Sequence, residues 1–319
     1  MSKTNKILIT GLAGYMGQLL LPHLEQDAGI QEIVGIDCQP LPANVSSSKL
    51  TFYQFDIRDP QIKPLFAGVD TVVHLAFVLM RTPGDNDMDD INTLGSRHVF
   101  ETAAAQGVRK LVVTSSVVAY GLHPDNPIPL TEESALRPNP GLYYSRDKAA
   151  NEAYLDEFQQ RHPEMIITRL RPCTVIGPRA KPALMASFLN ERAILVKGFD
   201  PPYQLLHEED LTSALALVIR HDLPGVYNVT SDEPATLSHL TALRKGKVTA
   251  LPYALARGMM ASLWRMGKTP FAPEWIDLSC YPLIASNEKL KRAGWKPQYT
   301  TVQAYIDLLK SHGIHISEQ

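Results

Sequence analysis

Tyr144 and Lys148 stand four residues apart and have the side-chain types of a proton-transfer pair. On a helix this spacing places both side chains on one face, one turn apart. A phenol with a pKa of about 10 is a poor base at neutral pH, but a nearby ammonium group favours the phenolate. Lowering this pKa to about 7 needs about 4 kcal/mol, which two cations in a dry cleft can supply. The pair therefore predicts that Tyr144 exchanges a proton with a substrate alcohol.

A serine positioned to hold the same substrate oxygen follows an apolar run upstream. The run, residues 110–114, predicts a buried strand, and Ser115 and Ser116 come directly after it. Ser116 would then lie at the edge of the sheet where ligands bind, beside Tyr144. Each group also has a simpler interpretation, because a Tyr–Lys pair can lie exposed on a helix and a serine can cap a strand end.

A glycine-rich loop near the start predicts a dinucleotide site. Gly11, Gly14 and Gly17 lie between an apolar run at residues 6–10 and a helical pattern that begins at residue 18. Glycine at these spacings lets the backbone approach a pyrophosphate, and the helix start offers unpaired N–H groups to the anion. The loop residues expected to contact the cofactor are Gly11, Gly14, Tyr15, Met16 and Gly17.

Asp37 closes a second apolar run, twenty residues past Gly17. A carboxylate there accepts hydrogen bonds from a ribose diol and repels a 2′-phosphate. No arginine or lysine follows, since the next residues are Cys38, Gln39 and Pro40. The sequence therefore predicts NAD rather than NADP as cofactor.

Alternating strands and helices must position these groups. Continuous apolar runs predict parallel strands at residues 6–10, 32–37, 50–55, 71–76, 110–114, 165–170 and 225–229. Helices are expected at residues 90–106, 144–161 and 208–220. The fold class is α/β, a doubly wound Rossmann-type parallel sheet with a smaller, mixed C-terminal substrate-binding cap. Residues 1–180 with about 204–232 form the NAD-binding domain, and about 181–203 with 233–319 form the cap.

Composition narrows the remaining functions. A formal net charge of −2 gives no field for nucleic acid or an anionic membrane, so neither partner is expected. Three distant cysteines form no metal pattern and favour a reduced, cytoplasmic location. No metal site is expected: His74 is interpreted as a core histidine, and residues 207–210 as a helix start with acids in its first turn. The expected partner is a small-molecule substrate.

Together these motifs resemble the extended short-chain dehydrogenase/reductases, the NAD-dependent epimerase/dehydratase family. The resemblance covers residues 6 to about 210: TGLAGYMG at 10–17, Asp37, DIRD at 56–59, HLA at 74–76, Asn92, SSVVAYG at 115–121, Tyr144 with Lys148, and residues 171–178. It implies that Ser116, Tyr144 and Lys148 are the catalytic set and that Lys148 also binds the nicotinamide ribose. It further implies that Asp56 and Ile57 contact adenine, that Leu75 and Ala76 line the ribose and phosphates, and that Pro172 touches the carboxamide.

Three departures from the family pattern bear on the reaction. At the position where sugar-nucleotide dehydratases typically carry Thr-Asp-Glu, this chain has Ser116, Val117 and Val118. Because valines cannot act as acid and base, 4,6-dehydration is disfavoured. Thr174 stands where nucleotide-sugar epimerases typically show asparagine. Tyr203 stands where they often place the arginine that grips a diphosphate. Because Arg179, Lys181 or Arg192 can substitute for that arginine, nucleotide sugars are disfavoured but stay open.

Three hypotheses for the function follow. The first is an NAD-dependent oxidoreductase acting at a secondary alcohol or ketone with Ser116, Tyr144 and Lys148. The second is a (nucleotide-)sugar epimerase using tightly bound NAD, and the third is a non-enzymatic NAD-sensing regulator. By the same resemblance we expect a homodimer through a four-helix bundle made by the helices at 90–106 and 144–161, whose apolar positions Val99, Ala103, Ala149 and Ala153 permit it.

Overall fold

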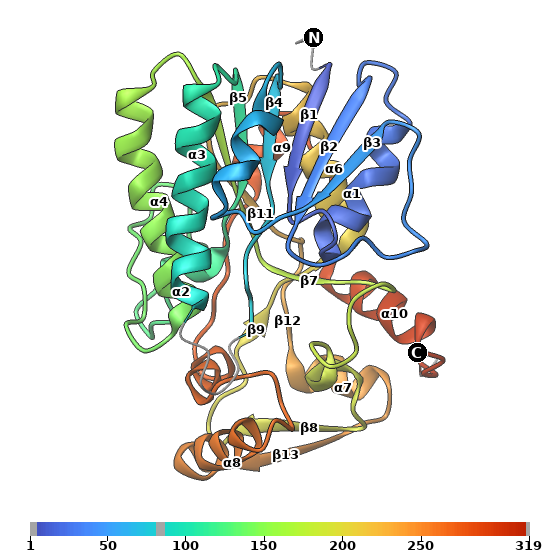
Figure 1. Cartoon of the computed structure of the whole chain (residues 1–319). Coiled ribbons are helices and arrows are strands. Elements are labelled where there is room, and N and C mark those ends of the chain that lie inside the picture. The colour runs from blue at the N-terminus through green and yellow to red at the C-terminus, as the bar shows by residue number, and fades with distance from the viewer. Residues whose placement is uncertain (1–4, 81–86, 317–319) are drawn as a thin grey trace.

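A seven-stranded parallel sheet forms the centre of the protein, whose computed structural model describes residues 5–80 and 87–316. The strand order is β11-β6-β5-β4-β1-β2-β3 (Figure 1). Every neighbouring pair in this sheet is parallel. The strands are β1 (Lys6–Thr10), β2 (Glu32–Asp37), β3 (Leu50–Gln54), β4 (Thr71–His74), β5 (Lys110–Thr114), β6 (Ile166–Pro172) and β11 (Gly225–Val229).

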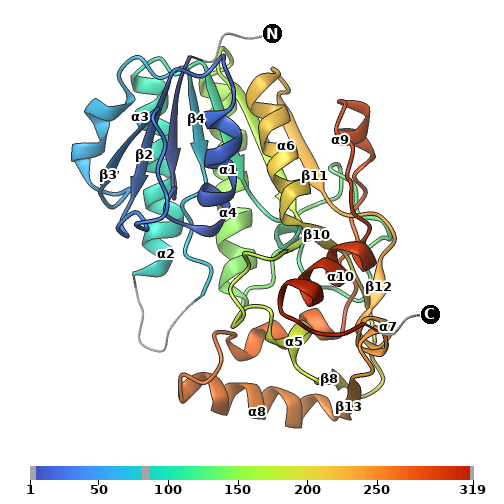
Figure 2. The same ribbon diagram turned by 90° about the vertical axis from the view of Figure 1, so that its right-hand side faces the viewer.

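Helices cover both faces of the sheet, which explains why its central strands are apolar on both sides. Helices α1 (Tyr15–Glu25) and α6 (Glu208–Arg220) pack on one face, and α3 (Ser96–Ala105) and α4 (Tyr143–Arg161) on the other (Figures 1 and 2). Each face has its own buried core cluster, containing leucines of α1 and α6 in one case and Val99, Phe100, Leu155 and Phe158 in the other. The doubly wound Rossmann-type fold is therefore confirmed.

The expected elements lie within about three residues of where the sequence places them, since α1 begins at Tyr15 rather than at residue 18 and β6 spans Ile166–Pro172. Two other differences change an element. The helix expected at residues 90–106 is divided into α2 (Met88–Asp90), a π-helical turn η2 (Ile91–Gly95) and α3. The strand expected at 71–76 ends at His74, because Leu75 and Ala76 leave the sheet beside the glycine loop. Two short 3-10 helices, η1 (Pro60–Phe66) and η3 (Val117–Tyr120), follow β3 and β5.

A buried lysine joins the sheet to α6. Lys110 begins β5 with no exposed surface, and its Nζ donates hydrogen bonds to the carbonyls of Val218, Ile219 and His221 at the end of α6. The same ammonium pairs with Asp222 at 2.8 Å. The charge satisfies carbonyls that a helix C-terminus leaves without partners.

The smaller cap combines short strands and helices around a third core cluster and lies below the sheet in Figures 1 and 2. Its two-stranded sheets pair β12 (Ala235–Thr236) with β9 (Pro202–Tyr203) and β13 (Lys247–Leu251) with β8 (Arg192–Val196). A further pair, β10 (Leu205–His207) with β7 (Thr174–Ile176), belongs to the residues expected in the NAD-binding domain. The helical elements of the cap are α5 (Ala186–Leu189), α7 (Leu237–Leu243), α8 (Tyr253–Arg265), η4 (Pro273–Ser279) and α10 (Thr301–Ser311), with α9 (Glu288–Arg292) beside β11. No helix in residues 5–80 or 87–316 is long and apolar enough to cross a membrane.

Candidate active site

The glycine loop joins β1 to α1 and leaves no room for side chains. Gly11 has φ +75°, and a Cβ there would lie 2.6 Å from the backbone nitrogen of Ala76. A Cβ on Gly17 would lie 2.5 Å from Leu12 Cα. Gly14 donates its N–H to the Gly11 carbonyl at 3.1 Å and precedes the first turn of α1. This tight turn at a helix N-terminus fits a dinucleotide pyrophosphate.

Asp37 closes β2 beside this loop. Its Oδ2 accepts a hydrogen bond from the N–H of Ala13 at 3.0 Å, and its Oδ1 accepts one from Gln39 at 2.9 Å. The parallel pairing of β1 with β2 brings the two segments together. The carboxylate thus stands next to the glycine loop, as the Asp37 assignment requires.

The three residues predicted for catalysis meet at the carboxyl end of β5. Ser116 follows this strand and caps η3 by accepting a hydrogen bond from Val118 N at 3.2 Å. Tyr144 and Lys148 lie in the first two turns of α4, and the Tyr144 hydroxyl hydrogen-bonds with Ser116. Ser116 therefore caps the 3-10 helix that follows the strand, where its simpler interpretation was a cap of the strand end, and it also contacts Tyr144.

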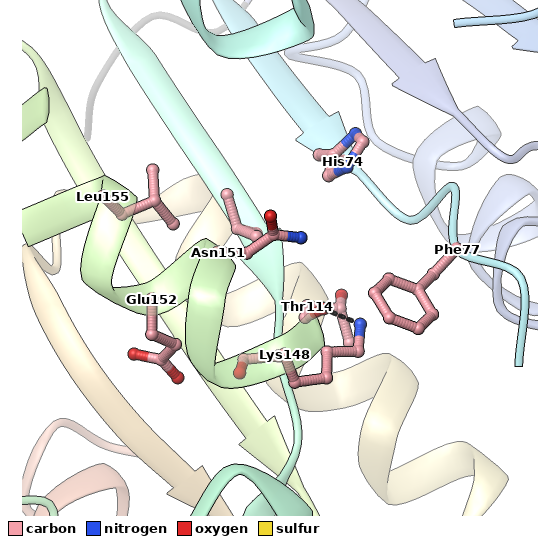
Figure 3. Close-up of a pocket in the computed structure, with 9 residues that line it drawn as sticks. His74, Phe77, Thr114, Lys148, Asn151, Glu152 and Leu155 are labelled. Atoms are coloured by element: carbon pink, nitrogen blue, oxygen red, sulfur yellow. Dashed lines mark hydrogen bonds between the residues drawn. The ribbon is translucent and has the colours of Figure 1, made fainter. Parts of the chain in front are cut away.

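Lys148 contacts groups other than the Tyr144 hydroxyl. Its Nζ donates to the Thr114 carbonyl at 2.8 Å and lies 3.6 Å from the centre of the Phe77 ring. Together with Phe77, Thr114 and Asn151 it lines a small cavity between β4, β5 and α4 (Figure 3). Thr114 Oγ1 and Asn151 Oδ1 are buried there without a hydrogen-bond partner. The cavity measures about 10 Å³, room for about one water molecule, so a larger ligand can reach Lys148 only from outside it.

The pKa values differ from the expectation that Lys148 lowers the pKa of Tyr144. Burial raises the pKa of Tyr144 to about 12, only partly offset by its hydrogen bond to Ser116. Burial lowers the pKa of Lys148 to about 7, opposed by the charges of Glu152 and Asp147. The reason is that Phe77 and Trp275 cover the phenol, while the ammonium lies 5.8 Å from its ring centre. A further cation beside the phenol is therefore needed to lower the Tyr144 pKa.

We predict that Lys148 makes stability depend on pH. With a folded-state pKa of about 7 and an ordinary value of 10.5, the folded chain holds fewer protons than the unfolded chain between these values. The free energy of unfolding therefore rises with pH across this window, by at most about 1.4 kcal/mol per pH unit from this residue. Urea unfolding at several pH values should show that Lys148→Met loses this rise. Equal slopes for wild type and variant would contradict the assignment.

The remaining predicted cofactor residues lie around the same edge of the sheet. Leu75 and Ala76 contact Gly11, and Pro172 ends β6 with its carbonyl 3.4 Å from Ser116 Oγ. Asp56 accepts hydrogen bonds from the Arg58 guanidinium, which lower the pKa of this carboxyl. Ile57 is buried against Gly95. Met16 packs on the core beneath α1.

Tyr15 has a contact that the sequence did not reveal. Its hydroxyl donates to Glu208 Oε2 at 2.5 Å, joining the glycine loop to the start of α6. Glu208 is almost fully buried, and the backbone N–H of Arg179 also points to it. Burial and the neighbouring carboxylate raise the pKa of Tyr15, so the phenol stays the donor. Residues 207–210 begin α6 with three acids in its first turn. Glu208 also accepts the hydrogen bond from Tyr15, which the sequence did not indicate.

Aromatic residues that sequence analysis did not assign cover Tyr144. The Trp275 ring stacks on Tyr144 with 5.4 Å between centres, and Phe77 meets it edge-on at 5.5 Å. Phe271 in turn packs edge-on against the Trp275 ring. Trp275 belongs to η4, in the part of the chain where no motif could be interpreted. Only the position of Phe77, directly after Leu75 and Ala76, could have indicated its role.

His74 and the acidic residues form no metal centre. His74 is buried between Thr10 Oγ1 and Ser96 Oγ, and burial lowers its pKa to about 3, so it is neutral. Within the described ranges no group of three or more His, Cys, Asp or Glu side chains could hold a metal ion.

Comparison with known proteins identifies the family. The family model described as NAD dependent epimerase/dehydratase family matches residues 7–230, more than half of the chain. The chain belongs to this family. Family membership identifies it as an enzyme with NAD as its cofactor. The glycine loop and Asp37 fit that cofactor.

Individual relatives include proteins with and without a named activity. An uncharacterized protein of Mycobacterium bovis is 26% identical over 317 residues, covering 97% of this chain and 84% of the relative. A UDP-glucose 4-epimerase of Mycolicibacterium smegmatis is 31% identical over 189 residues, covering 56% of this chain and 58% of the relative. The structure of a Thermus thermophilus UDP-glucose 4-epimerase complex with NAD superposes with a TM-score of 0.74 at 22% identity, covering 96% and 98% of the two chains. This similarity shows a shared fold.

Two of the three cations considered as replacements for the diphosphate arginine contact other side chains. Arg179 is near Glu208 and Glu209, at 3.9 Å from each. Arg192 donates to Thr249 on the outer strand pair of the cap. Lys181 is exposed. Tyr203 itself is held by a hydrogen bond from its hydroxyl to the Leu278 carbonyl and by the Phe188 ring.

Proposed function

We propose that this enzyme of the NAD-dependent epimerase/dehydratase family transfers hydride at a secondary alcohol or ketone. The observation that carries the proposal is the contact between the Ser116 and Tyr144 hydroxyls at the carboxyl end of β5, with Lys148 one turn along α4. The glycine loop opens at the same edge of the sheet, where ligands of such folds bind. The apolar rings around Tyr144 support a substrate that carries little charge at its reacting end.

Each side chain has a distinct role in this proposal. Ser116 holds the substrate oxygen by a hydrogen bond, and Tyr144 takes its proton in oxidation or returns it in reduction. Lys148, one turn along α4 from Tyr144, holds ribose hydroxyls and supplies positive charge near the phenol. When bound, NAD accepts or returns the hydride. Trp275 and Phe77 exclude water from the phenol, which strengthens the electrostatic effects there.

Epimerisation is the second candidate, because relatives named UDP-glucose 4-epimerase match by sequence and by structure. The same three residues serve this reaction, with hydride returned to the other face of the substrate. Tyr203, held against Leu278 and Phe188, supports the oxidoreductase over a nucleotide-sugar epimerase, because no guanidinium is available there for a diphosphate. No specific observation favours the third hypothesis, a regulator without activity.

The two reactions are distinguished by where the hydride ends. We expect the purified enzyme, given NAD and a panel of secondary alcohols, to accumulate reduced cofactor in proportion to product, measured by nicotinamide absorbance. Epimerisation of a nucleotide sugar without accumulation, with NAD retained through purification, would replace this proposal with the second candidate.

Asp37 is proposed to select NAD over NADP. We predict that Asp37→Asn, which keeps the shape and loses the charge, shifts the ratio of the two Kd values toward NADP by about tenfold or more, as loss of one repulsive charge implies. Cofactor titration by fluorescence measures both constants. Asp59→Asn, at a half-buried carboxylate that caps η1, is the matched control and should leave the ratio unchanged. An unchanged ratio in Asp37→Asn would contradict the assignment.

The homodimer and the cytoplasmic location are also proposals. Val99 and Ala103 are buried in the core under the sheet and Ala149 is buried as well, so these three side chains serve the monomer. A contact between two copies would then use Leu94, which is 53% exposed beside α3, and the exposed Ala153 on α4. The three cysteines are free thiols, which supports a reducing compartment.

A further inference from the structure

Exposed apolar side chains gather at the far end of the cap. Among residues 5–80 and 87–316, eight large hydrophobic side chains are exposed, and six of them lie between residues 194 and 266. Leu255 and Met266 are each 57% exposed. These side chains belong to the elements drawn lowest in Figures 1 and 2, namely β8, β13, α8 and their flanking loops. We call this surface the cap end; its apolar members are Ile194, Phe199, Val248, Tyr253, Leu255 and Met266.

Positive charge is concentrated in the same segment. Residues 234–273 contain no Asp or Glu, although the whole chain has a net charge of −2. The cations of this segment are Arg244, Lys245, Lys247, Arg257, Arg265 and Lys268, all exposed except Arg244. Arg192 and Lys197 on β8 and its following loop add two exposed cations, which Glu191 and Asp200 offset.

Helix α8 explains how the protein presents this surface. Ala256, Met260 and Trp264 recur every four residues and pack inward against the core clusters. The core therefore uses one stripe of the helix. Leu255, Arg257 and Arg265 lie outside this stripe and are exposed. The nearest acids are on η4, where Asp277 accepts a hydrogen bond from Tyr253 and Glu274 lies 4.0 Å from Arg257.

We propose that the cap end docks on the surface of a membrane that contains anionic lipids. Apolar side chains flanked by Lys and Arg are the composition of segments that lie in the interface of a bilayer. Each Lys or Arg near an anionic surface raises affinity about fivefold. The overall charge of −2 indicated no such partner, because it averages a basic segment with an acidic remainder.

Charge complementarity selects lipid over the other occupants of this surface. A second copy of the chain would bring the same cations against each other, and like charges repel across an interface. An acidic protein would satisfy the cations but would not by itself account for the exposed apolar side chains of Leu255 and Met266. A bilayer offers both environments at the depths where these side chains reach.

Vesicle co-sedimentation tests the proposal with the intact enzyme. We expect wild-type protein to pellet with vesicles of phosphatidylcholine mixed with phosphatidylglycerol, to pellet far less with phosphatidylcholine alone, and to be released by high salt. Arg265→Glu with Lys268→Glu should weaken binding roughly 25-fold or more. Leu255→Asp with Met266→Asp should weaken it about tenfold or more.

Matched controls separate this surface from general effects. Lys63→Glu with Lys310→Glu reverses two exposed cations outside the cap end, and Ile128→Asp changes an exposed apolar residue elsewhere. These controls should bind vesicles as wild type does. Circular dichroism and NAD affinity should be unchanged in all variants, since none of the residues lies in the active site.

Several outcomes would overturn the proposal. Wild-type protein that remains in the supernatant with anionic vesicles would do so, as would controls that lose binding equally. Loss of a dimer in the cap-end variants, seen by light scattering without any vesicle binding by wild type, would assign the surface to a second copy instead.

Discussion

Tyr144→Phe is expected to lower kcat by about 10²- to 10⁴-fold, the range that positioned acid–base groups contribute. The substitution removes only the hydroxyl, so the ring contacts with Trp275 and Phe77 persist. Ser116 would still contact the substrate oxygen, but no group would exchange its proton. NAD affinity and the free energy of unfolding should change little. Steady-state kinetics with a confirmed substrate, together with NAD titration, measure the effect.

Tyr143→Phe is the matched control for this experiment. Its hydroxyl donates to the Leu79 carbonyl at 3.1 Å and is one residue away on the same helix turn. Removing it should leave kcat within a few-fold of wild type. Full turnover by Tyr144→Phe, or an equal loss in Tyr143→Phe, would remove Tyr144 from the catalytic set.

Gly11→Ala is expected to weaken NAD binding at least tenfold and to destabilise the protein. A Cβ at this position would lie 2.6 to 2.8 Å from the backbone of Leu75 and Ala76, where no flexible side chain can move away. The positive φ of +75° adds strain of about 1 to 3 kcal/mol for a residue other than glycine. The loop must therefore separate from Leu75 and Ala76, which follow β4, and the N–H groups proposed to bind the pyrophosphate move with it. Isothermal titration with NAD and urea unfolding measure both effects.

Gly68→Ala is the control that separates the effect of backbone strain from the effect of the close backbone contact at Gly11. Gly68 has φ +69°, close to that of Gly11, but a Cβ there would meet no atom within 4 Å. We expect a loss of stability from strain alone, with NAD affinity unchanged. If Gly68→Ala and Gly11→Ala weaken NAD binding equally, the close contact of Gly11 with Leu75 and Ala76 is not what shapes the cofactor site.

Sequence patterns predicted the sheet and the edge at which the site lies. Continuous apolar runs identify strands buried on both faces, and the order of strands and helices then restricts the topology. The contacts of Gly11 with Ala76, and of Ser116 with Tyr144, follow from parallel strands that end at one edge. Local spacing carries this information, so one sequence is enough.

Contacts between distant segments were not predictable in the same way. Trp275 reaches Tyr144 from 131 positions further along the chain, and no local pattern connects them. Glu208 reaches Tyr15 because α6 packs beside α1, which depends on the assembled fold. Burial, to which Phe77 and Trp275 contribute, raises the pKa of Tyr144 and lowers that of Lys148, and no local spacing indicates it.

Helix α6 is fixed at both ends by buried polar groups. At its start Glu208 accepts a hydrogen bond from the hydroxyl of Tyr15, next to the glycine loop. At its end Lys110 of β5 donates hydrogen bonds to the last carbonyls. Because Ser116 closely follows β5, the helix connects the glycine loop to the strand that positions Ser116. The cap takes part in this link, because the N–H groups of Gln298 and Tyr299 donate to Asp210 in the first turn of α6. A substitution at Glu208 or Lys110 would therefore change the relative position of the glycine loop and Ser116 without touching either of them.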